Sequence, residues 1–156
     1  EDKSIQHAGI GIGICDLAAN LLTNTPKNFH AYFGRECLPQ NLSAVTGACL
    51  FSRRSIYEEV GYMDEENFAV AFNDVDFCLK IRQAGYLIVY NPYIEFMHYE
   101  SKTRGYEDTP EKKARFERES NNFKTKWRKV LDAGDPYSNI NFDKNTAQYN
   151  IRTDKI

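Results

Sequence analysis

The sequence predicts a single α/β domain, and three observations support this prediction. The first is a nearly continuous apolar run from Ser43 to Phe51, which is typical of a strand that is covered on both faces. The second is a pair of helical patterns, at residues 73–84 and 110–134, each followed by a glycine. The third is the composition, because 156 residues with 42% hydrophobic and 27% charged side chains suit one domain with its own core.

The chain opens with glycine-rich strand material from Ser4 to Ile14. The glycines of "GIGIG" raise the alternative of a phosphate-binding loop, but no clear helical stripe follows them, as the dinucleotide fingerprint requires. A bent or closely packed strand is the favoured interpretation. A long connection rich in Asn, Thr and Pro follows from Asn20 to Asn41, and ordered loops of this length are often functional.

Two helices and a strand follow the apolar run. Ser52 is placed to cap a short helix that ends before Gly61, and Asn73 is placed to cap a second helix that ends before Gly85. Four residues of the second helix share its inward face: Phe77, Cys78, Ile81 and Ala84. The stretch "YLIVYNPYIEFMHYE" predicts a strand, a turn at "NP" and a second extended segment that ends near His98.

The last third of the chain predicts one long helix and an irregular tail. Thr109 and Pro110 mark the start of the helix. Its apolar stripe consists of Phe116, Phe123, Trp127, Val130 and Leu131. The predicted domain therefore has a sheet with short helices in residues 1–109, a long helix in residues 110–134 and a polar tail in residues 135–156.

The bulk properties argue against several classes of protein. A net charge of −2 gives no basic surface for nucleic acid. No apolar run is long enough for a transmembrane segment, and no signal-peptide pattern opens the chain. Cys49 and Cys78 lie in apolar runs, which indicates buried thiols rather than disulfides or metal ligands. The first residue is not methionine and the chain starts in a strand-like pattern, so we expect a piece of a longer protein.

Two aspartates, Asp74 and Asp76, stand one residue apart at the predicted start of the second helix. The structural interpretation is that both stabilise the helix dipole, by about 0.3–1 kcal/mol each. The functional interpretation is a catalytic or metal-binding carboxylate. Residues two apart on a helix point roughly 200° away from each other, so the pair cannot easily hold one ion. We therefore expect Asp74 to face a cleft and Asp76 to cap the helix.

His98 is the second candidate. It ends an extended stretch and shares a face with Phe96. A histidine in this position is either structural or a ligand of a divalent ion, because neutral imidazole binds such ions. His7 and His30 have no comparable sequence context.

Taken in order, these motifs resemble the C-terminal half of a family 2 glycosyltransferase of the GT-A fold. The resemblance covers roughly residues 4–142. It rests on "VTGACLF", a helix that ends in glycine, an acidic pair that opens the next helix, "AGY" after that helix, and a strand that leads to His98. The flanking segments "IQHAG", "RGYEDTPEKKARFERE" and "DPYSNINF" extend it.

The resemblance implies a partial fold: a mixed sheet with flanking helices that lacks the N-terminal, nucleotide-binding half. In this family the missing half binds the nucleotide sugar and holds Mn²⁺ or Mg²⁺ through an Asp-x-Asp motif, whereas the present half forms the acceptor site and supplies the base. The family's base belongs to an acidic doublet, which reads Asn73-Asp74 here. The resemblance therefore assigns the base to Asp74 and leaves the supporting role of Asn73 open.

Further roles follow from the same resemblance. His98 matches a histidine that some members use as an additional metal ligand. Thr46, Gly47 and Asn73 are expected to contact substrate, and Arg104 either holds the diphosphate or is a surface charge. We expect this chain alone to hold no metal ion, because the Asp-x-Asp motif is missing.

The leading hypothesis is thus a fragment of an inverting glycosyltransferase in polysaccharide biosynthesis. It would move a sugar from a nucleotide-sugar donor to a hydroxyl of a glycan acceptor, in the cytoplasm or at the inner face of the membrane. The N-terminal half of the same protein would complete the site, so the chain alone is expected to be inactive. One alternative is a non-catalytic carbohydrate-binding or assembly module. Another is a metal-dependent hydrolase built on Asp74, Asp76 and His98.

Overall fold

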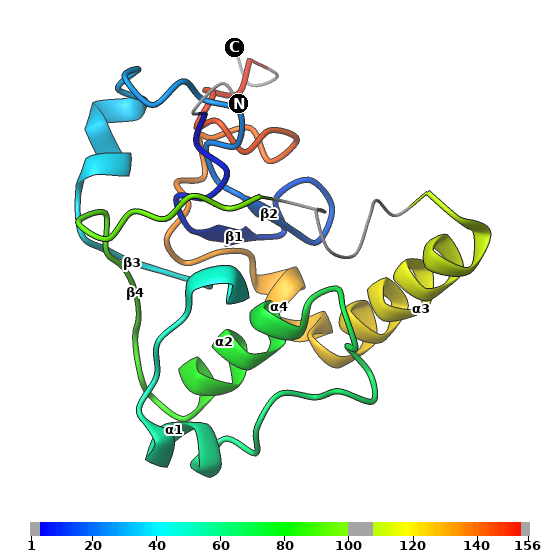
Figure 1. Cartoon of the computed structure of the whole chain (residues 1–156). Helices are drawn as coiled ribbons and strands as arrows, with labels where there is room; N and C mark the ends of the chain where they lie inside the picture. The colour runs from blue at the N-terminus through cyan, green and yellow to red at the C-terminus, as the bar shows by residue number, and fades with distance from the viewer. Residues whose placement is uncertain (1–3, 100–107, 154–156) are drawn as a thin grey trace.

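The computed structural model describes residues 4–99 and 108–153 (Figure 1). It contains ten short elements, which are named here in chain order. These are β1 (Ile10–Ile12), β2 (Ala18–Asn20), the 3₁₀ segment η1 (Tyr32–Cys37), β3 (Gln40–Leu42), the 3₁₀ turn η2 (Gly47–Cys49), α1 (Arg54–Glu59), α2 (Asn73–Gln83), β4 (Ile88–Tyr90), α3 (Pro110–Lys126) and α4 (Arg128–Ala133). Helices and strands together confirm an α/β architecture.

The strands form two antiparallel pairs. β1 pairs with β2, and β3 pairs with β4. A single antiparallel bridge between Ile10 and Ala44 links the two pairs, with an Ile10 N to Ala44 O distance of 2.8 Å. The expected mixed sheet is therefore wrong for the described part of the chain, in which every strand pair is antiparallel. Each of these strands has only three residues.

The predicted strand from Ser43 to Phe51 is also wrong in its extent. Ser43 and Ala44 are fully buried, as expected, but regular pairing ends at Leu42. The Thr46 hydroxyl accepts a hydrogen bond from the Ala48 N–H, and this local bond stabilises a turn where a strand would need a partner strand.

Gly9 confirms the interpretation of the first segment as closely packed. Its backbone has a φ of +100°, and a Cβ atom built there would lie 1.9 Å from the Leu42 Cδ1. Only glycine combines this backbone conformation with so close an approach of another side chain. The segment forms one edge of the β1–β2 hairpin and contacts the β3 strand directly.

The central helix is α2. Its buried residues are Val75, Asp76, Phe77, Cys78, Leu79 and Ile81. Most of the predicted inward face is confirmed, but Ala84 is exposed, because the helix ends at Gln83 and Ala84 is the C-cap. The short helix α1 is confirmed as well. Its N-cap is Arg53 and not Ser52, whose hydroxyl donates to the Arg53 carbonyl instead.

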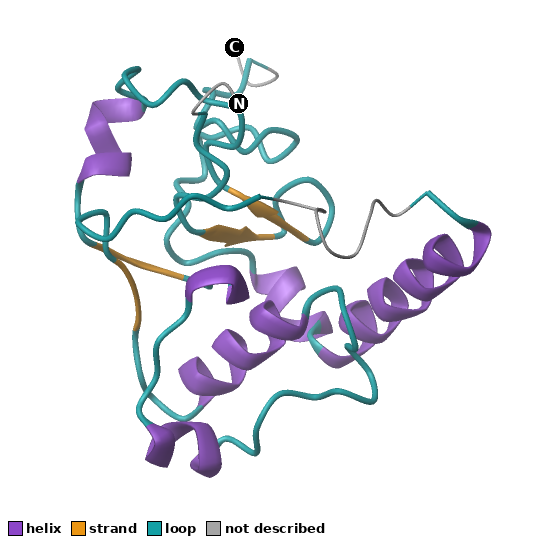
Figure 2. Ribbon diagram, viewed as in Figure 1, coloured by secondary structure: helices purple, strands orange, loops and turns teal. Residues whose placement is uncertain are grey.

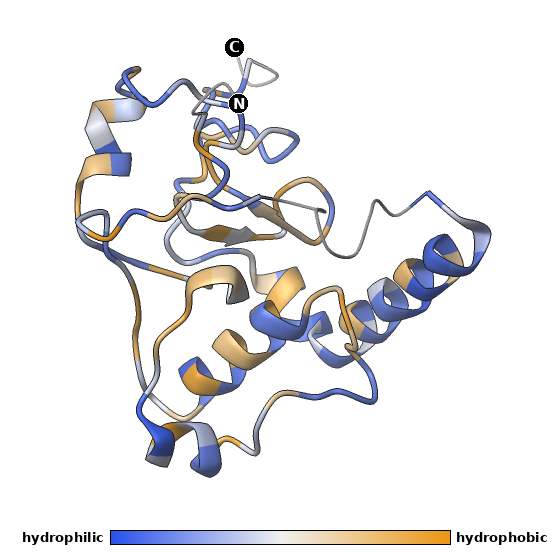
Figure 3. Ribbon diagram, in the orientation of Figure 1, coloured by the Kyte–Doolittle hydropathy of each residue, from blue (hydrophilic) through white to orange (hydrophobic). Residues whose placement is uncertain are grey.

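The predicted long helix is divided at Trp127 into α3 and α4. Thr109 caps α3 through its side chain, as predicted, and Pro110 is its first residue. Trp127 leaves the helical conformation, with a φ of −106° and a ψ of +19°. Phe123 and Trp127 are buried, whereas Phe116 is about half exposed. Figure 3 shows that much of α3 is hydrophilic, in keeping with the alternating charges of its sequence.

The main core lies between α2, the β1 strand and the α3–α4 junction. Phe72 stacks on Phe123 with ring centroids 4.8 Å apart, and Phe68 contacts the same ring edge-on at 6.2 Å. Figure 2 shows α1 to α4 grouped on one side of the β1–β2 hairpin, with loops and η1 on the other side. The helical half therefore contains most of the regular packing.

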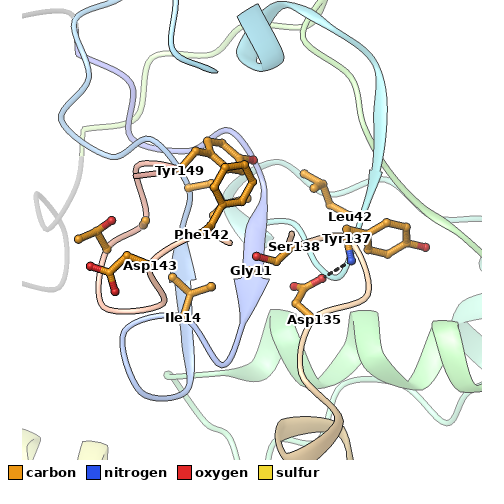
Figure 4. Close-up of a pocket in the computed structure, with 12 residues that line it drawn as sticks. Gly11, Ile14, Leu42, Asp135, Tyr137, Ser138, Phe142, Asp143 and Tyr149 are labelled. Carbon is orange, nitrogen blue, oxygen red and sulfur yellow. Dashed lines mark hydrogen bonds between the residues drawn. The ribbon is translucent and has the colours of Figure 1, made fainter. Parts of the chain in front are cut away.

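The tail is irregular, as predicted, but it packs closely on the rest of the chain. Asp135 accepts hydrogen bonds from the Ile12 N–H at 2.7 Å and from the Tyr137 N–H at 2.8 Å (Figure 4). Phe142 is buried against Tyr149, and a cavity of about 20 Å³ remains beside them. A space of this size holds about one water molecule. The tail thus covers the β1–β2 hairpin on the side away from α2.

Candidate functional site

A broad groove is lined by loops together with residues of two helices. Its lining comes from residues 4–7, 23–24, 27, 36–37, 45–46, 48–53 and 86–99, with Ile56 of α1 and Ile81 of α2. Its exposed aromatic side chains are Phe51, Tyr86, Tyr93, Phe96 and Tyr99. Exposed aromatic rings of this kind can stack on sugar rings, although they also serve as general apolar surface.

Asp74 does not itself line this groove, but it lies directly behind one part of the lining, the turn at residues 46–48. Thr46 and Ala48 line the groove, and Gly47 lies between them. The Gly47 N–H donates to the Asp74 Oδ2 at 2.8 Å, and the Val75 N–H donates to the Asp74 Oδ1 at 2.8 Å. A Cβ atom on residue 47 would lie 3.3 Å from the Asp74 Cβ, so glycine permits this close approach. Each carboxylate oxygen still has a lone pair for another donor.

His7 approaches the same turn from the N-terminal segment. Its Nδ1 lies 2.8 Å from the Asn20 Oδ1, and its Nε2 accepts from the Gly9 N–H at 3.2 Å and the Thr46 N–H at 3.4 Å. Burial lowers the pKa of His7 below its ordinary value of 6.5, while the Asn20 bond and the Asp74 charge oppose that shift. The sequence pattern does not single out His7, because two of its hydrogen-bond partners, Asn20 and Thr46, are remote in the sequence.

The position of Asn73 corrects the predicted helix start. Phe72, in the left-handed conformation with a φ of +63°, precedes the helix, and Asn73 is the first helical residue. The Asn73 Oδ1 accepts from the Asp74 N–H at 2.7 Å, so it stabilises the first turn without occupying the N-cap position. The sequence predicted Asn73 as a polar N-cap, but the N-cap position is taken by Phe72, whose ring stacks on Phe123.

Asp76 does not cap the helix. It is completely buried, and its Oδ1 accepts from the Trp127 Nε1 at 2.8 Å and lies 2.8 Å from the Lys126 Nζ. Burial lowers the pKa of Lys126, but its bonds to Asp76 and Asp64 outweigh that effect, so the pKa is raised. Asp76 therefore supports the fold by joining α2 to the α3–α4 junction, and the predicted cap is wrong because the α2 backbone turns its side chain inward.

His98 lies in the groove lining and is exposed. Its Nδ1 is 2.7 Å from the Gln6 Oε1. Within residues 4–99 and 108–153, His98 shares no three-residue group of potential metal ligands with Asp74 and Asp76. The hydrolase alternative, which needs these three residues on one ion, is therefore wrong. His98 offers one ligand, and an ion there would need others from outside the described residues.

The remaining predicted site residue is Arg104. It lies outside the described residues, so its assignment stays a prediction. The structure thus brings Thr46, Gly47, Asn73 and Asp74 together at one edge of the groove, with His7 as an additional neighbour. His98 lines the same groove from a different segment.

Comparison with known proteins relates the chain to glycosyltransferases. It is 38% identical to the N-acetylglucosaminyl-diphospho-decaprenol L-rhamnosyltransferase of Mycobacterium tuberculosis over 61 residues, which are 39% of this chain and 20% of that protein. It is 30% identical to the O-antigen biosynthesis protein RfbC of Myxococcus xanthus over 111 residues, 70% of this chain and 9% of that protein. These matches show a distant relationship of this chain to part of a rhamnosyltransferase and part of an O-antigen biosynthesis protein.

A more similar relative carries no functional name. The uncharacterized protein y4gI of Sinorhizobium fredii is 48% identical over 140 residues, which are 90% of this chain and 15% of that protein. The chain thus spans a fifth or less of the length of these relatives. No family model and no solved structure matches the chain.

The helices of the described residues do not meet the requirements of a membrane span. Among those in the described ranges, none combines the length and the apolar character that crossing a bilayer requires.

Proposed function

We propose that this chain is the acceptor-side half of an inverting glycosyltransferase of family 2 with the GT-A fold, and that Asp74 is its general base. One observation carries the proposal. The Asp74 carboxylate is fixed at the first turn of α2 against the turn whose residues Thr46 and Ala48 line the groove. The relationship to a rhamnosyltransferase supports sugar transfer as the chemistry.

The proposed reaction needs one carboxylate in this place. The acceptor hydroxyl attacks the anomeric carbon of the donor sugar, the bond to the nucleoside diphosphate breaks, and Asp74 takes the hydroxyl proton. The positive end of the α2 dipole stabilises the carboxylate charge. Two backbone N–H groups fix its orientation, which holds the base ready for an incoming hydroxyl.

The neighbours of Asp74 have complementary roles in this proposal. The Thr46 hydroxyl accepts from the Ala48 N–H, so its own proton can be donated to a sugar oxygen. The Asn73 Oδ1 is occupied by the Asp74 N–H, which leaves its amide group for the acceptor. Gly47 keeps the turn close to Asp74. Asp76 contributes only by holding the helix in place.

The donor side lies outside this chain in the proposal. A nucleotide sugar and a Mn²⁺ or Mg²⁺ ion would be held by an N-terminal half in a longer polypeptide, located in the cytoplasm or at the inner face of the membrane. The ion would neutralise charge on the leaving diphosphate. His98 would supply at most one ligand, and Arg104 would contact the diphosphate. The 156 residues alone are expected to catalyse no transfer.

The test is Asp74→Asn in the longer polypeptide. Asparagine keeps an oxygen for the Gly47 N–H but cannot accept a proton at neutral pH. We expect kcat to fall by about 10²–10⁴-fold, with donor affinity unchanged. Asp132→Asn is the matched control, because Asp132 is an exposed carboxylate paired only with Arg128 on α4. It should leave kcat unchanged.

One observation favours a non-catalytic module as the second candidate. Both oxygens of Asp74 accept backbone N–H groups, which is also what a purely structural aspartate would do. The same variant separates the two functions. Unchanged turnover in Asp74→Asn, with turnover demonstrated in the parent polypeptide, would refute the base assignment and favour a carbohydrate-binding or assembly role.

A further inference from the structure

A second group of chemically active side chains lies in residues 30–37, a segment remote from Asp74 in the sequence. His30, Glu36 and Cys37 place one ligand atom each within 4.8 Å of one another. It is the one such three-residue group within residues 4–99 and 108–153. Glu36 and Cys37 line the groove. The glycosyl-transfer proposal does not use any of the three.

The backbone of η1 explains why these residues meet. His30 precedes η1, and Glu36 and Cys37 end it. Phe33 and Gly34 in the middle of η1 adopt left-handed conformations, with φ values of +55° and +66°. This kink turns the end of η1 back toward its start. Left-handed backbone at a non-glycine residue costs roughly 1–2 kcal/mol, so the surrounding contacts must hold it.

Contacts from other elements hold the group in place. The Tyr90 hydroxyl of β4 donates to the Glu36 carbonyl at 3.0 Å. The Arg35 Nε donates to the Gln40 Oε1 at 2.9 Å, and the Arg35 guanidinium lies 5.1 Å from the Tyr149 ring centroid. The segment is therefore anchored to β3, β4 and the tail, so the three ligand atoms are brought together before any ligand binds.

The distances fit a tetrahedral ion. The His30 Nδ1 lies 3.0 Å from the Glu36 Oε1 and 3.7 Å from the Cys37 Sγ, and the Sγ lies 3.5 Å from the same Oε1. A tetrahedral ion with ligands at about 2.0–2.3 Å separates neighbouring ligand atoms by about 3.3–3.6 Å. Adjustments of a few tenths of an ångström would place all three atoms in the first coordination sphere.

Glu36 has one carboxylate oxygen without a partner. Its side chain is only 7% exposed, and its Oε2, the oxygen that His30 and Cys37 do not contact, is buried without a hydrogen-bond partner. Buried carboxylate oxygens are normally satisfied, and a bound cation is one way to satisfy them. Imidazole, thiolate and carboxylate together suit zinc-class ions, whereas Mg²⁺ and Mn²⁺ prefer oxygen ligands.

We propose that the His30 Nδ1, the Glu36 carboxylate and the Cys37 thiolate bind a divalent transition-metal ion of the zinc class. Three protein ligands leave one coordination position of a tetrahedral ion open. On binding, the Cys37 thiol releases its proton to solvent as the sulfur–metal bond forms. The site is independent of the base assignment at Asp74, and it differs in ligand type from the Mn²⁺ or Mg²⁺ site expected in the donor half.

The test is Co²⁺ binding by the full 156-residue chain, kept reduced. Co²⁺ substitutes for Zn²⁺, and its thiolate charge-transfer band reports a sulfur ligand directly. We expect a one-to-one complex with this band, which added Zn²⁺ displaces. Cys37→Ser should abolish the band and weaken Zn²⁺ affinity beyond the roughly 10–100-fold that loss of an outer-shell partner costs. His30→Ala should weaken it similarly.

A matched control keeps the test specific. Cys15→Ser changes another exposed free cysteine, and it should bind Co²⁺ as the unmodified chain does. His30 and Cys37 are exposed, so their variants should fold, which thermal melting can check. Absence of the band in the unmodified chain, or its persistence in folded Cys37→Ser, would overturn the proposal.

Discussion

The two sides of the first turn of α2 differ in almost every respect, although Asp74 and Asp76 are only two residues apart. On one side Asp76 is completely buried and joined to Trp127 and Lys126. On the other side Asp74 is partly exposed, and its oxygens accept backbone N–H groups from Gly47 and Val75. A rotation of roughly 200° between residues two apart produces this separation.

The difference shows that two carboxylates in one helical turn can have separate roles, one in stabilising the fold and one in a candidate site. A second buried carboxylate, Glu119 of α3, also holds the start of α2. It accepts a hydrogen bond at 2.6 Å from the N–H of Ala71, which lies two residues before α2. These buried bonds fix where α2 begins. The Asp74 side faces the loop that carries Gly47, and functional residues are often found where loops meet a rigid helix.

The largest expected effect comes from breaking the buried side. Asp76→Ala leaves the Trp127 indole N–H and the Lys126 ammonium without their shared acceptor. Removing one partner of a buried ion pair typically destabilises a protein by about 3 kcal/mol or more. We expect the lower end, about 3 kcal/mol, because Lys126 is about one-third exposed and keeps Asp64 as a partner. We therefore expect the free energy of unfolding, measured by urea denaturation, to fall by about that amount.

A matched substitution on the surface defines the baseline for this measurement. Asp132→Ala removes a carboxylate that is exposed on α4, so it should change the unfolding free energy by no more than about 0.5 kcal/mol. Equal losses in the two variants would show that Asp76 does not anchor α2. Asp74→Asn should also be close to the baseline, because its bonds to the backbone can be kept in part.

The sequence predicted the buried helix faces well and the strands poorly. Phe77 and Ile81 of α2 and Phe123 of α3 are buried as predicted. A helix makes its backbone hydrogen bonds within itself, so the apolar pattern of each helix depends only on local spacing. The strand predicted through Gly47 is wrong, because strands depend on distant partners, and here the Thr46 side chain stabilises a turn.

The candidate site was only partly visible in the sequence for the same reason. Asp74 could be singled out, because the first turn of a helix has a recognisable pattern. His7 and the group of His30, Glu36 and Cys37 could not be, since their contacts depend on left-handed residues and on pairing between remote segments. The inward direction of Asp76 depends on Phe72, and no cap motif predicts an aromatic residue there.

An intermediate effect is expected where the N-terminal segment packs against β3. Gly9→Ala would place a Cβ against the Leu42 side chain in a left-handed backbone conformation. Overpacking of this kind typically costs about 1–3 kcal/mol. Gly13→Ala is the matched control, because Gly13 also has a positive φ but nothing within 4 Å of its Cβ position. The unfolding free energy of Gly9→Ala should fall further than that of Gly13→Ala, and similar losses would refute the close packing.

The smallest expected effect is a pH dependence at His7, which tests the electrostatics of the Asp74 side. Because burial lowers the His7 pKa below 6.5, the unfolded chain binds more protons than the folded chain just below that pH. The contribution of His7 to stability is therefore fully present above pH 6.5 and is lost as the pH falls through the lowered value. The slope cannot exceed about 1.4 kcal/mol per pH unit for one proton.

Urea denaturation across this range should show a decline that His7→Gln removes and that His98→Gln, at an exposed histidine, keeps. Asp74→Asn sharpens the result. The Asp74 charge raises the His7 pKa, so removing it should lower that pKa further and extend the decline to lower pH. An Asp74→Asn profile identical to that of the unmodified chain would mean that the two residues do not interact, and that the groove edge lacks the electrostatic coupling that its geometry implies.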